Sequence, residues 1–382
     1  MKSKLEELIE KFCPNGVEYR KLGLYCKILK GKQLNKEKLL ENGKYPAYNG
    51  GVIHSGFTRD YNVKENTTII SQGGASAGFV QFIETKFWAN AHCYYLEPDV
   101  NILNNKYIYY IVKQNQDKLM KCQYGAGIPA LKSDEIFNLL IPLPPLEIQE
   151  EIVRILDKFT ELTTELTTEL TLRKQQYEHY RDELLTFGDE IPIFPLDKLA
   201  QYSKEKIKAS EINETNYVGV DNLLQNKRGK VNSNYVQTKG NLTKYEKEDI
   251  LIGNIRPYLK KIWFSDNFGG ASNDVLVIQN ISDKILSKYL YIVLCSEKFF
   301  DYNIKNSKGA KMPRGSKEAI MKYIIPVPPL EEQKRIVEIL DRFDKYINDI
   351  KEGLPAEIEI RQKQYEHYRK ELLDFKKLNM ER

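Results

Sequence analysis

The chain has 382 residues, 41% of them hydrophobic and 29% charged, with a formal net charge of +5 at pH 7. This length predicts two or three domains, and the hydrophobic share excludes wholesale disorder because it is enough to bury cores. No apolar run approaches the roughly 20 residues that span a bilayer. The charged first 12 residues lack the apolar stretch of a secretion signal, so we expect a cytoplasmic protein without a membrane segment.

The five cysteines are odd in number and form no Cys-x-x-Cys pair, which predicts free thiols and neither a disulfide framework nor a zinc site. The sequence also lacks a P-loop and the glycine fingerprint of a dinucleotide-binding fold. It contains no Asn-Pro-Pro-aromatic or Asp-Pro-Pro-aromatic motif of an amino-methyltransferase, and no cluster of carboxylates and lysine typical of a nuclease. We therefore expect no catalytic site, no metal site and no cofactor on this chain.

The first variable segment, residues 18–140, is rich in Tyr, Ile, Asn, Gly and Lys, which predicts a small globular domain. Thr67–Ile70 has the composition of a strand, and Lys106–Met120 is expected to be helical. The segment contains 16 Lys and Arg against 11 Asp and Glu, a net charge of +5.

A long helix is predicted to follow, from Leu146 to Phe187, after the Pro-rich approach Pro142-Leu143-Pro144-Pro145. From Ile148 to Leu166 its apolar residues recur at steps of 4, 3, 4, 3 and 4, which is typical of a coiled-coil seam.

Residues 160–170 of this helix repeat the tetrapeptide Glu-Leu-Thr-Thr. Threonine is a weak helix former, so pairing with another helix must keep this stretch helical. The repeat is either a tolerated low-complexity patch or a spacer in which one added unit lengthens the helix by about 6 Å.

The second variable segment, residues 191–324, resembles the first in composition and contains 22 Lys and Arg against 14 Asp and Glu, a net charge of +8. Val275–Ile278 is expected to be a strand and Lys288–Phe300 a helix. Two short landmarks recur in both segments: Lys-Tyr at 106 and 288, and Ala-x-x-Pro at 126 and 310.

The C-terminal segment repeats the long helix. Residues 325–343 match residues 141–159 at 13 of 19 positions, and residues 361–375 match residues 173–187 at 11 of 15. Gly353 and Pro355 should bend or break this second copy. We expect the two helical copies to pack on each other, the alternative being that each seam binds a different chain.

Charge is distributed unevenly, because the two variable segments together carry +13 and the rest of the chain −8. Lys and Arg neutralise phosphates, and Arg, Asn and Gln can bind base edges, so the basic segments suit DNA. A Lys-rich composition inherited from an AT-rich genome is the alternative explanation of the charge.

The motif Ile-Pro-x-Pro-Pro-Leu-Glu-x-Gln-x-x-Ile-Val-x-Ile-Leu-Asp occurs twice, each time after a variable segment of about 130 residues. In this the chain resembles, over essentially its whole length, the specificity subunit of type I restriction–modification enzymes. The resemblance implies an α+β fold with two similar α/β target recognition domains, two long antiparallel helices that form a coiled coil, and a pseudo-two-fold internal repeat. The implied domains are 1–140 (first recognition domain with an N-terminal helix), 141–190 (central helical spacer), 191–324 (second recognition domain) and 325–382 (C-terminal helical spacer).

The resemblance further implies that each recognition domain reads one half of a bipartite, asymmetric site on double-stranded DNA, the two halves lying about one helical turn apart. Two methyltransferase subunits would dock on this non-catalytic chain, and restriction subunits can join them. The partners would carry the S-adenosylmethionine, ATP and Mg²⁺, the N6-adenine methylation and the cleavage of DNA. Competing interpretations are a two-domain protein-interaction scaffold without DNA specificity and a stand-alone nuclease.

We expect the DNA contacts in predicted loops and strand ends, where binding residues concentrate. The strongest cluster is 254–261, which interleaves side chains suited to reading bases, stacking and binding phosphate. The candidates are Lys30, Lys32, Gln33, Tyr48, Asn49, Arg59, Gln72, Ser76 and Asn90 in the first segment, and Lys227, Arg228, Lys230, Asn254, Arg256, Tyr258, Lys260, Lys261, Lys311 and Arg314 in the second.

Overall fold

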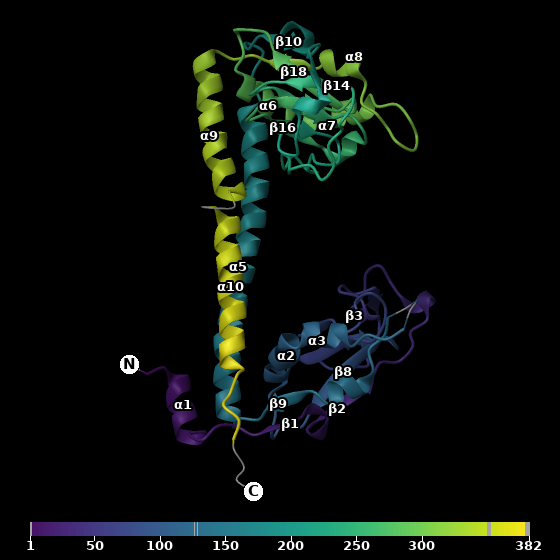
Figure 1. Ribbon diagram of the computed structural model, residues 1–382, viewed down its shortest axis with the longest axis vertical. Coiled ribbons are helices and arrows are strands. Elements are labelled where there is room, and N and C mark those ends of the chain that lie inside the picture. Colours follow the sequence, from purple (N-terminus) through teal and green to yellow (C-terminus); the bar gives the residue numbers. More distant parts are fainter. Residues whose placement is uncertain (1, 126, 128, 350–352, 379–382) are drawn as a thin grey trace. The chain divides into compact units, whose positions relative to one another are not determined.

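The computed structural model describes residues 2–125, 127, 129–349 and 353–378, and Figure 1 shows its elements. The chain divides into two compact units. Unit 1 consists of Met1–Thr167 and Glu357–Arg382, and unit 2 of Thr168–Ala356. The described helices include none long and apolar enough to cross a membrane. The division of the chain into four segments stays a prediction.

Unit 1 contains a four-stranded antiparallel sheet in the order β2-β8-β5-β6 and a smaller sheet in the order β4-β3-β7. The central strand β5 has the sequence Thr-Thr-Ile-Ile-Ser and all its residues are buried, as β-branched side chains favour. The elements of the unit are α1 (Lys4–Phe12), β1 (Tyr19–Lys21), η1 (Leu22–Leu24), β2 (Cys26–Lys30), η2 (Lys36–Lys38), β3 (Tyr45–Tyr48), β4 (Gly56–Thr58), β5 (Thr67–Ser71), β6 (Val80–Ile83), β7 (Trp88–Ala89), β8 (Cys93–Pro98), α2 (Asn105–Gln114), α3 (Gln116–Lys121), α4 (Ser133–Phe137) and β9 (Leu140–Pro142).

Unit 2 repeats the main sheet, in the order β11-β18-β15-β16, and β10 pairs with β19 as β1 pairs with β9. Its second sheet differs, with four strands in the order β12-β14-β17-β13. The elements of the unit are β10 (Ile193–Pro195), η3 (Leu196–Lys198), β11 (Ala200–Tyr202), β12 (Lys206–Lys208), η4 (Ala209–Glu211), β13 (Tyr217–Val218), β14 (Asn241–Tyr245), β15 (Ile250–Gly253), η5 (Pro257–Leu259), β16 (Ile262–Phe264), β17 (Gly269–Ala271), β18 (Val275–Asn280), α6 (Ser287–Leu294), α7 (Glu297–Lys305), α8 (Lys317–Met321), β19 (Ile324–Pro326) and α9 (Leu330–Asn348).

The predicted strands are confirmed as β5 and β18, but each single helix predicted inside the variable segments is two helices. In unit 1 the chain turns at Asn115, between α2 and α3. In unit 2 the Ser296 hydroxyl accepts from the Phe299 N–H and caps a new helix, α7. A polar residue that competes for backbone hydrogen bonds divides the helical stretch in both units.

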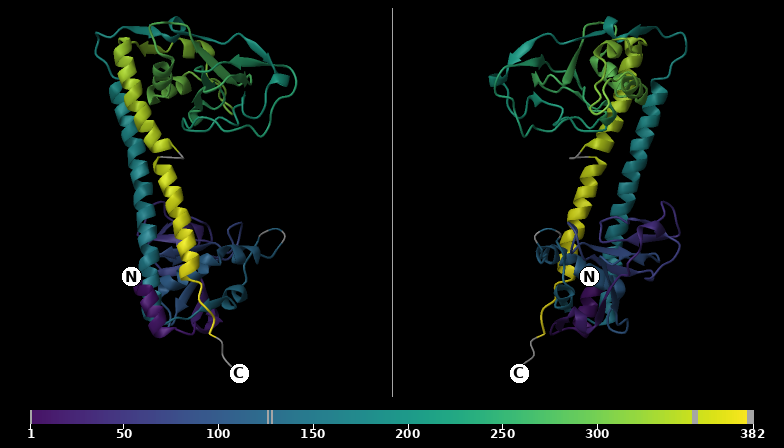
Figure 2. Two further views of the ribbon diagram at one scale, coloured as in Figure 1. Left: turned by 60° about the vertical axis from the view of Figure 1, so that its left-hand side comes forward. Right: turned by 90° about the vertical axis from the view of Figure 1, so that its right-hand side faces the viewer.

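Helix α5 (Leu146–Leu184) extends through parts of both units, and helix α10 (Leu354–Leu372) follows α9. In unit 1 α5 lies beside α10 (Figure 2). There the Phe159 and Tyr368 rings stack with centroids 5.1 Å apart. In unit 2 α5 lies beside α9, where Tyr177 and Phe343 meet at 5.8 Å. The predicted pairing is therefore confirmed within each unit, and each pair joins one block from each copy of the repeat.

The predicted break in the second copy is confirmed. Helix α9 ends at Asn348 and α10 begins at Leu354, which places Pro355 in the first turn, where its missing N–H breaks no helical hydrogen bond. Residues 350–352 between the helices lie outside the described residues.

The Glu-Leu-Thr-Thr stretch is helical throughout. Its threonine hydroxyls donate to the backbone carbonyls four residues earlier, as Thr163 does to Phe159 at 2.9 Å and Thr164 to Thr160 at 2.8 Å. This bonding satisfies hydroxyls on the helix surface and leaves the leucines for packing.

Both long helices are fixed to their globular domains by a buried glutamine, which is the Gln of the repeated motif. The Gln149 amide donates to the carbonyls of Ile102 and Pro144, each at 2.8 Å, and accepts from the Asn104 N–H at 2.9 Å. Gln333 makes the same three bonds in unit 2, to Lys284, Pro328 and Leu286. Both side chains are fully buried.

An aromatic and ionic contact adds to this attachment. In unit 1 Lys106 lies 3.1 Å from Asp157 of α5 and over the Phe82 ring. In unit 2 Lys288 lies 3.1 Å from Asp341 of α9 and over the Phe264 ring. The recurring Lys-Tyr landmark therefore marks the place where each domain rests on its helix pair.

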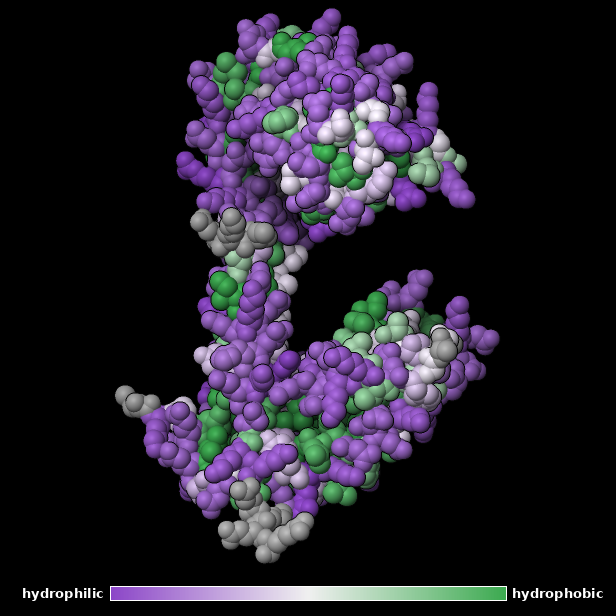
Figure 3. Space-filling view, viewed as in Figure 1, coloured by the Kyte–Doolittle hydropathy of each residue, from purple (hydrophilic) through white to green (hydrophobic). Residues whose placement is uncertain are grey.

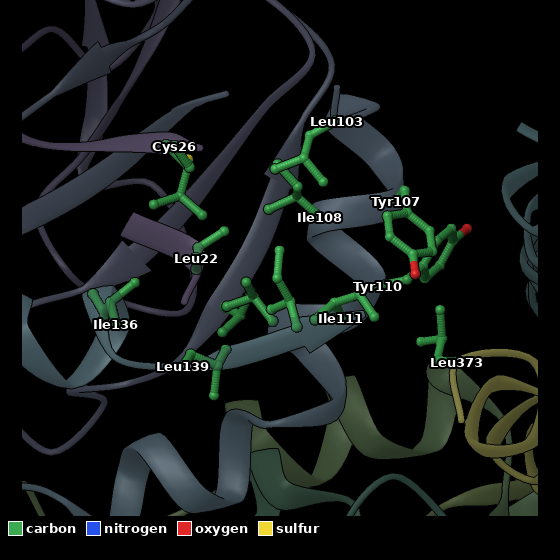
Figure 4. Packing of buried hydrophobic residues seen from close by; sticks show 14 of the residues in the cluster. Leu22, Cys26, Leu103, Tyr107, Ile108, Tyr110, Ile111, Ile136, Leu139 and Leu373 are labelled. Atoms are coloured by element: carbon green, nitrogen blue, oxygen red, sulfur yellow. The ribbon is translucent and has the colours of Figure 1, made fainter. Parts of the chain in front are cut away.

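The main core of unit 1 lies between its large sheet, α2 and the start of α5. Figure 4 shows Tyr107, Ile108 and Ile111 of α2 in one cluster with Leu22 and Leu139. Leu373, which follows α10, belongs to the same cluster, so the C-terminal helix is part of this core.

We predict that Gln149→Leu and Gln333→Leu each lower the free energy of unfolding by about 3 kcal/mol, since three buried hydrogen bonds worth about 1 kcal/mol each are lost. Chemical denaturation followed by circular dichroism measures the change. Gln362→Leu on the exposed surface of α10 is the control and should change stability little. Equal losses in all three variants would contradict this role for the buried glutamines.

Candidate nucleic-acid interface

In unit 1, four segments meet at the end of the main sheet where β5 ends and β8 begins. The Gln72 N–H donates to the His92 carbonyl at 2.9 Å, and the Leu131 N–H donates to the Gln72 carbonyl at 2.8 Å. The Gly74 N–H donates to the Pro129 carbonyl at 2.8 Å. We call this surface the rim of unit 1, which consists of residues 49–54, 72–78, 90–92, 124–125, 127 and 129–131.

We call these three backbone hydrogen bonds the frame of the rim, and unit 2 makes the equivalent three bonds. The Asn254 N–H donates to Asp274 at 2.8 Å, the Gly315 N–H to Asn254 at 3.1 Å, and the Arg256 N–H to Pro313 at 2.7 Å. We call this surface the rim of unit 2, which consists of residues 219–231, 254–261, 272–274 and 308–315. The proline of the Ala-x-x-Pro landmark supplies a carbonyl to this frame in both rims, whereas Ala126 lies outside the described residues.

The two rims have the same pattern of backbone hydrogen bonds but differ in charge. The rim of unit 2 contains nine Lys and Arg, and the rim of unit 1 contains none. At equivalent positions of the frame, Gly74 of unit 1 corresponds to Arg256 of unit 2, and Ala130 corresponds to Arg314. One scaffold therefore presents a neutral surface in one unit and a cationic surface in the other.

Comparison with known proteins agrees with a duplicated DNA specificity domain. A family model described as "Type I restriction modification DNA specificity domain" matches residues 14–173 and again 190–360. A type I restriction enzyme specificity subunit of Haemophilus influenzae is 30% identical over 97% of this chain and 98% of its own length. The EcoR124I/EcoR124II specificity subunit of Escherichia coli is 37% identical over 62% of this chain and 61% of its own length.

This chain belongs to the type I restriction–modification DNA specificity family. The fold agrees, since the crystal structure of a type I S subunit from M. genitalium aligns with a TM-score of 0.59 at 19% identity, covering 94% of this chain and 96% of that chain. A chain from a structural study of type I restriction–modification complex assembly aligns with a TM-score of 0.57 at 14% identity, covering 94% of this chain and 98% of that chain.

In this specificity-family chain, most candidate residues of unit 1 lie on the rim or beside it. The segment 30–33 adjoins the rim because the Gly31 N–H donates to the Cys93 carbonyl and the Lys32 N–H to Ala89. The candidates with exposed side chains are Lys30, Lys32, Gln33, Asn49 and Arg59. Gln72 is half-buried, with its amide oxygen 3.4 Å from the His92 ring.

The remaining three candidates of unit 1 hold the rim in shape. The Asn90 side chain is buried and accepts from the Leu34 and Ala91 N–H groups. The Ser76 hydroxyl donates to the Gly50 carbonyl at 2.8 Å. Tyr48 packs edge-on against Phe87, and burial raises the pKa of its hydroxyl.

In unit 2 the exposed candidates are Arg228, Arg256, Tyr258, Lys311 and Arg314. Arg256 has a left-handed backbone with φ of 53°, which is uncommon for a residue of its size and sets the direction in which its Cβ leaves the loop. The Arg314 guanidinium lies 3.0 Å from the Asp274 carboxylate, so it is held on the rim by an exposed ion pair.

The other five candidates of unit 2 belong to the scaffold, four through side-chain contacts and Asn254 through its backbone hydrogen bonds. Lys261 is buried and donates to the Val220 carbonyl, which ties the 219–231 segment to the main sheet. The Lys230 ammonium donates to Thr215 and lies 4.9 Å above the Trp263 ring. Asn254 is buried within the frame. Lys227 and Lys260 share the Glu297 carboxylate.

Glu297, the first residue of α7, thus joins two loops of the rim of unit 2. Burial by itself raises the pKa of its carboxyl, but hydrogen bonds and charge from Lys227 and Lys260 outweigh burial and lower the pKa from 4.5 to about 2.

Sequence reasoning missed Glu297 because it lies 70 positions from Lys227 and 37 from Lys260. It also missed Lys308, Tyr124, Val52 and Ile53, which are exposed on the rims.

We predict that Glu297→Gln lowers the melting temperature at pH 7 and that this difference shrinks as the pH falls. A carboxyl with a depressed folded pKa stabilises the protein above its unfolded pKa, and that stability is lost as pH falls toward the folded value. The window is therefore roughly pH 4.5 to 2, from the values above. Thermal melts across this range test it, with exposed Glu318→Gln as the control. A pH-independent difference would contradict the ionic role.

Proposed function

We propose that this chain is the DNA-recognition subunit of a type I restriction–modification complex and that each rim reads one half of a bipartite, asymmetric site. The observation that carries the proposal is that both units form the same frame of backbone hydrogen bonds but present different side chains on it. A frame of this kind places loops and a hairpin at one end of a sheet, where side chains can reach base edges in a groove.

The exposed basic side chains support DNA as the ligand of unit 2. Arg228, Arg256 and Arg314 extend from one rim together with Lys308 and Lys311. An arginine can bind guanine with two hydrogen bonds, whereas lysines suit phosphate. The lysines held by carboxylates or carbonyls keep the loops in place, and we assign them no DNA contact.

We propose further that the chain is non-catalytic and works with partners. Two methyltransferase subunits, one for each copy of the repeat, and restriction subunits would supply N6-adenine methylation and cleavage, together with S-adenosylmethionine, ATP and Mg²⁺. The net charge of −8 outside the two variable segments supports protein contacts there, because an acidic surface is repelled by DNA.

We predict that Arg256→Ala weakens binding to the full site by about 1–3 kcal/mol and relaxes sequence preference at one position of one half-site, as expected for loss of a base contact. Selection of bound duplexes from a randomised library, followed by salt titration, measures both effects. The control is Lys284→Ala, which removes a basic side chain beyond the opposite end of β18. A weakening that is equal for every sequence would assign Arg256 to phosphate instead of a base.

A second prediction concerns the spacing of the two half-sites. Inserting one Glu-Leu-Thr-Thr unit after Thr168 adds four helical residues, about 6 Å, close to two base pairs of duplex. We expect the gap in the recognised site to change while both half-sites stay the same, as read by mapping methylated sites in cells that contain the partner subunits. An unchanged gap would show that this stretch does not set the spacing.

A scaffold without DNA specificity would behave differently in the same binding experiment. Its affinity for duplex DNA would be weak, independent of sequence and shallow in its dependence on salt. Such a result with the full-length chain would overturn the proposed function.

A further inference from the structure

The hairpin between β3 and β4 places two aliphatic side chains in water at the rim of unit 1. Ile53 is 77% exposed and Val52 is 55% exposed, and they are adjacent at the tip of the hairpin. Figure 3 shows hydrophobic residues on the surface of this unit near β3. Single exposed apolar residues are ordinary on protein surfaces, so the anchoring of this tip decides whether it has a role.

The tip is anchored by three side chains of the β5–β6 region. The hydroxyls of Ser71 and Ser76 both donate to the Gly50 carbonyl, and the Gln81 amide donates to the Gly51 carbonyl at 3.1 Å. Gly50 has φ of +79°, and a Cβ there would lie 2.6 Å from the His92 carbonyl oxygen. The base of the hairpin is thus packed against the frame, and its aliphatic tip projects from this fixed base.

The remainder of this rim is uncharged at neutral pH. It contains no Lys, Arg, Asp or Glu, and cations lie beside it: Lys132, whose ammonium is 5.1 Å from the centre of the Tyr124 ring, and Lys30 and Lys32 on the adjoining segment. Phosphate attraction therefore comes from the side of the rim, and the surface that faces a groove offers apolar, amide and imidazole groups. In unit 2 the rim segment 219–231, which follows β13, carries the exposed Arg228.

We propose that Val52 and Ile53 are a specificity-determining contact of unit 1, and that their ligand is the C5 methyl group of a thymine in the major groove. This inference rests on the proposed function. The thymine methyl is the only apolar group among the base edges of the major groove, and aliphatic side chains are its usual protein partners. An anchored tip loses little conformational freedom on binding, which favours a contact of this kind.

The test uses the full-length chain and the duplex that it selects from a randomised library. The half-site that Arg256→Ala relaxes belongs to unit 2, so the other half-site belongs to unit 1. Each thymine of that half-site is replaced in turn by uracil, which removes only the methyl group. We expect one replacement to weaken binding about fourfold, the effect of losing one buried methyl.

The same duplexes are then bound by the Ile53→Ala variant. We expect this variant to bind the thymine duplex about tenfold more weakly, and the uracil penalty to disappear in it, because the methyl has lost its partner. Val100→Ala is the matched control, since Val100 is 66% exposed and follows the opposite end of β8. In that variant both affinity and the uracil penalty should stay at the original values.

The inference is overturned if no uracil replacement weakens binding, if the half-site of unit 1 contains no thymine, or if the penalty persists in Ile53→Ala. A loss of affinity in Ile53→Ala without any uracil penalty would indicate a wedge between base steps and would also reject the methyl contact. If the chain selects a bipartite site but fails these tests, only this inference fails. If it selects no sequence at all, the proposed function fails with it.

Discussion

The buried glutamine of the repeated motif is the contact on which the arrangement of each unit depends. Gln149 and Gln333 each bind three backbone groups: a carbonyl and an N–H just before a domain helix, and a proline carbonyl just before the long helix. No apolar residue can satisfy these groups, and an unsatisfied buried N–H or carbonyl costs free energy. The glutamine therefore requires the Pro-rich segment, the domain and the long helix to meet at one point in each unit.

Each unit has two parts with different roles: a scaffold that is built alike in both units, and a rim whose side chains differ. The helix pair and the frame of the rim are built alike in both units, through the same backbone hydrogen bonds and the same aromatic and ionic contacts. Since backbone groups make the frame, its side chains are free to differ, and they do, as Gly74 and Arg256 show. A duplicated protein can in this way keep one structure while it presents two chemically different surfaces.

Positive charge in unit 2 also has two roles that composition alone does not distinguish. Lys227, Lys260 and Lys261 are held by a carboxylate or a carbonyl and fix the loops. Arg228 and Arg256 extend into solvent from the loops that those lysines fix. The internal contacts thus fix the loops that carry the exposed guanidinium groups, which lowers the conformational entropy that binding would cost. In unit 1 serine and glutamine side chains hold the 49–54 hairpin in the same way.

The sequence by itself determined the duplication, the two long helices, the break near Gly353 and the basic character of both domains. These features are repeating or local patterns of side chains, which periodicity and composition reveal directly. The family resemblance followed from the same repeated motif, whose glutamine proved to be buried in both copies.

Only the tertiary structure decided which candidate residues face solvent and which hold the fold. Lys260 and Lys261 are neighbours in sequence, yet one pairs with Glu297 of α7 and the other is buried against the Val220 carbonyl. Burial and pairing depend on partners tens of residues away, and a local pattern contains no record of them. For the same reason no local pattern singled out Ile53, the most exposed of the large hydrophobic residues that the structure describes.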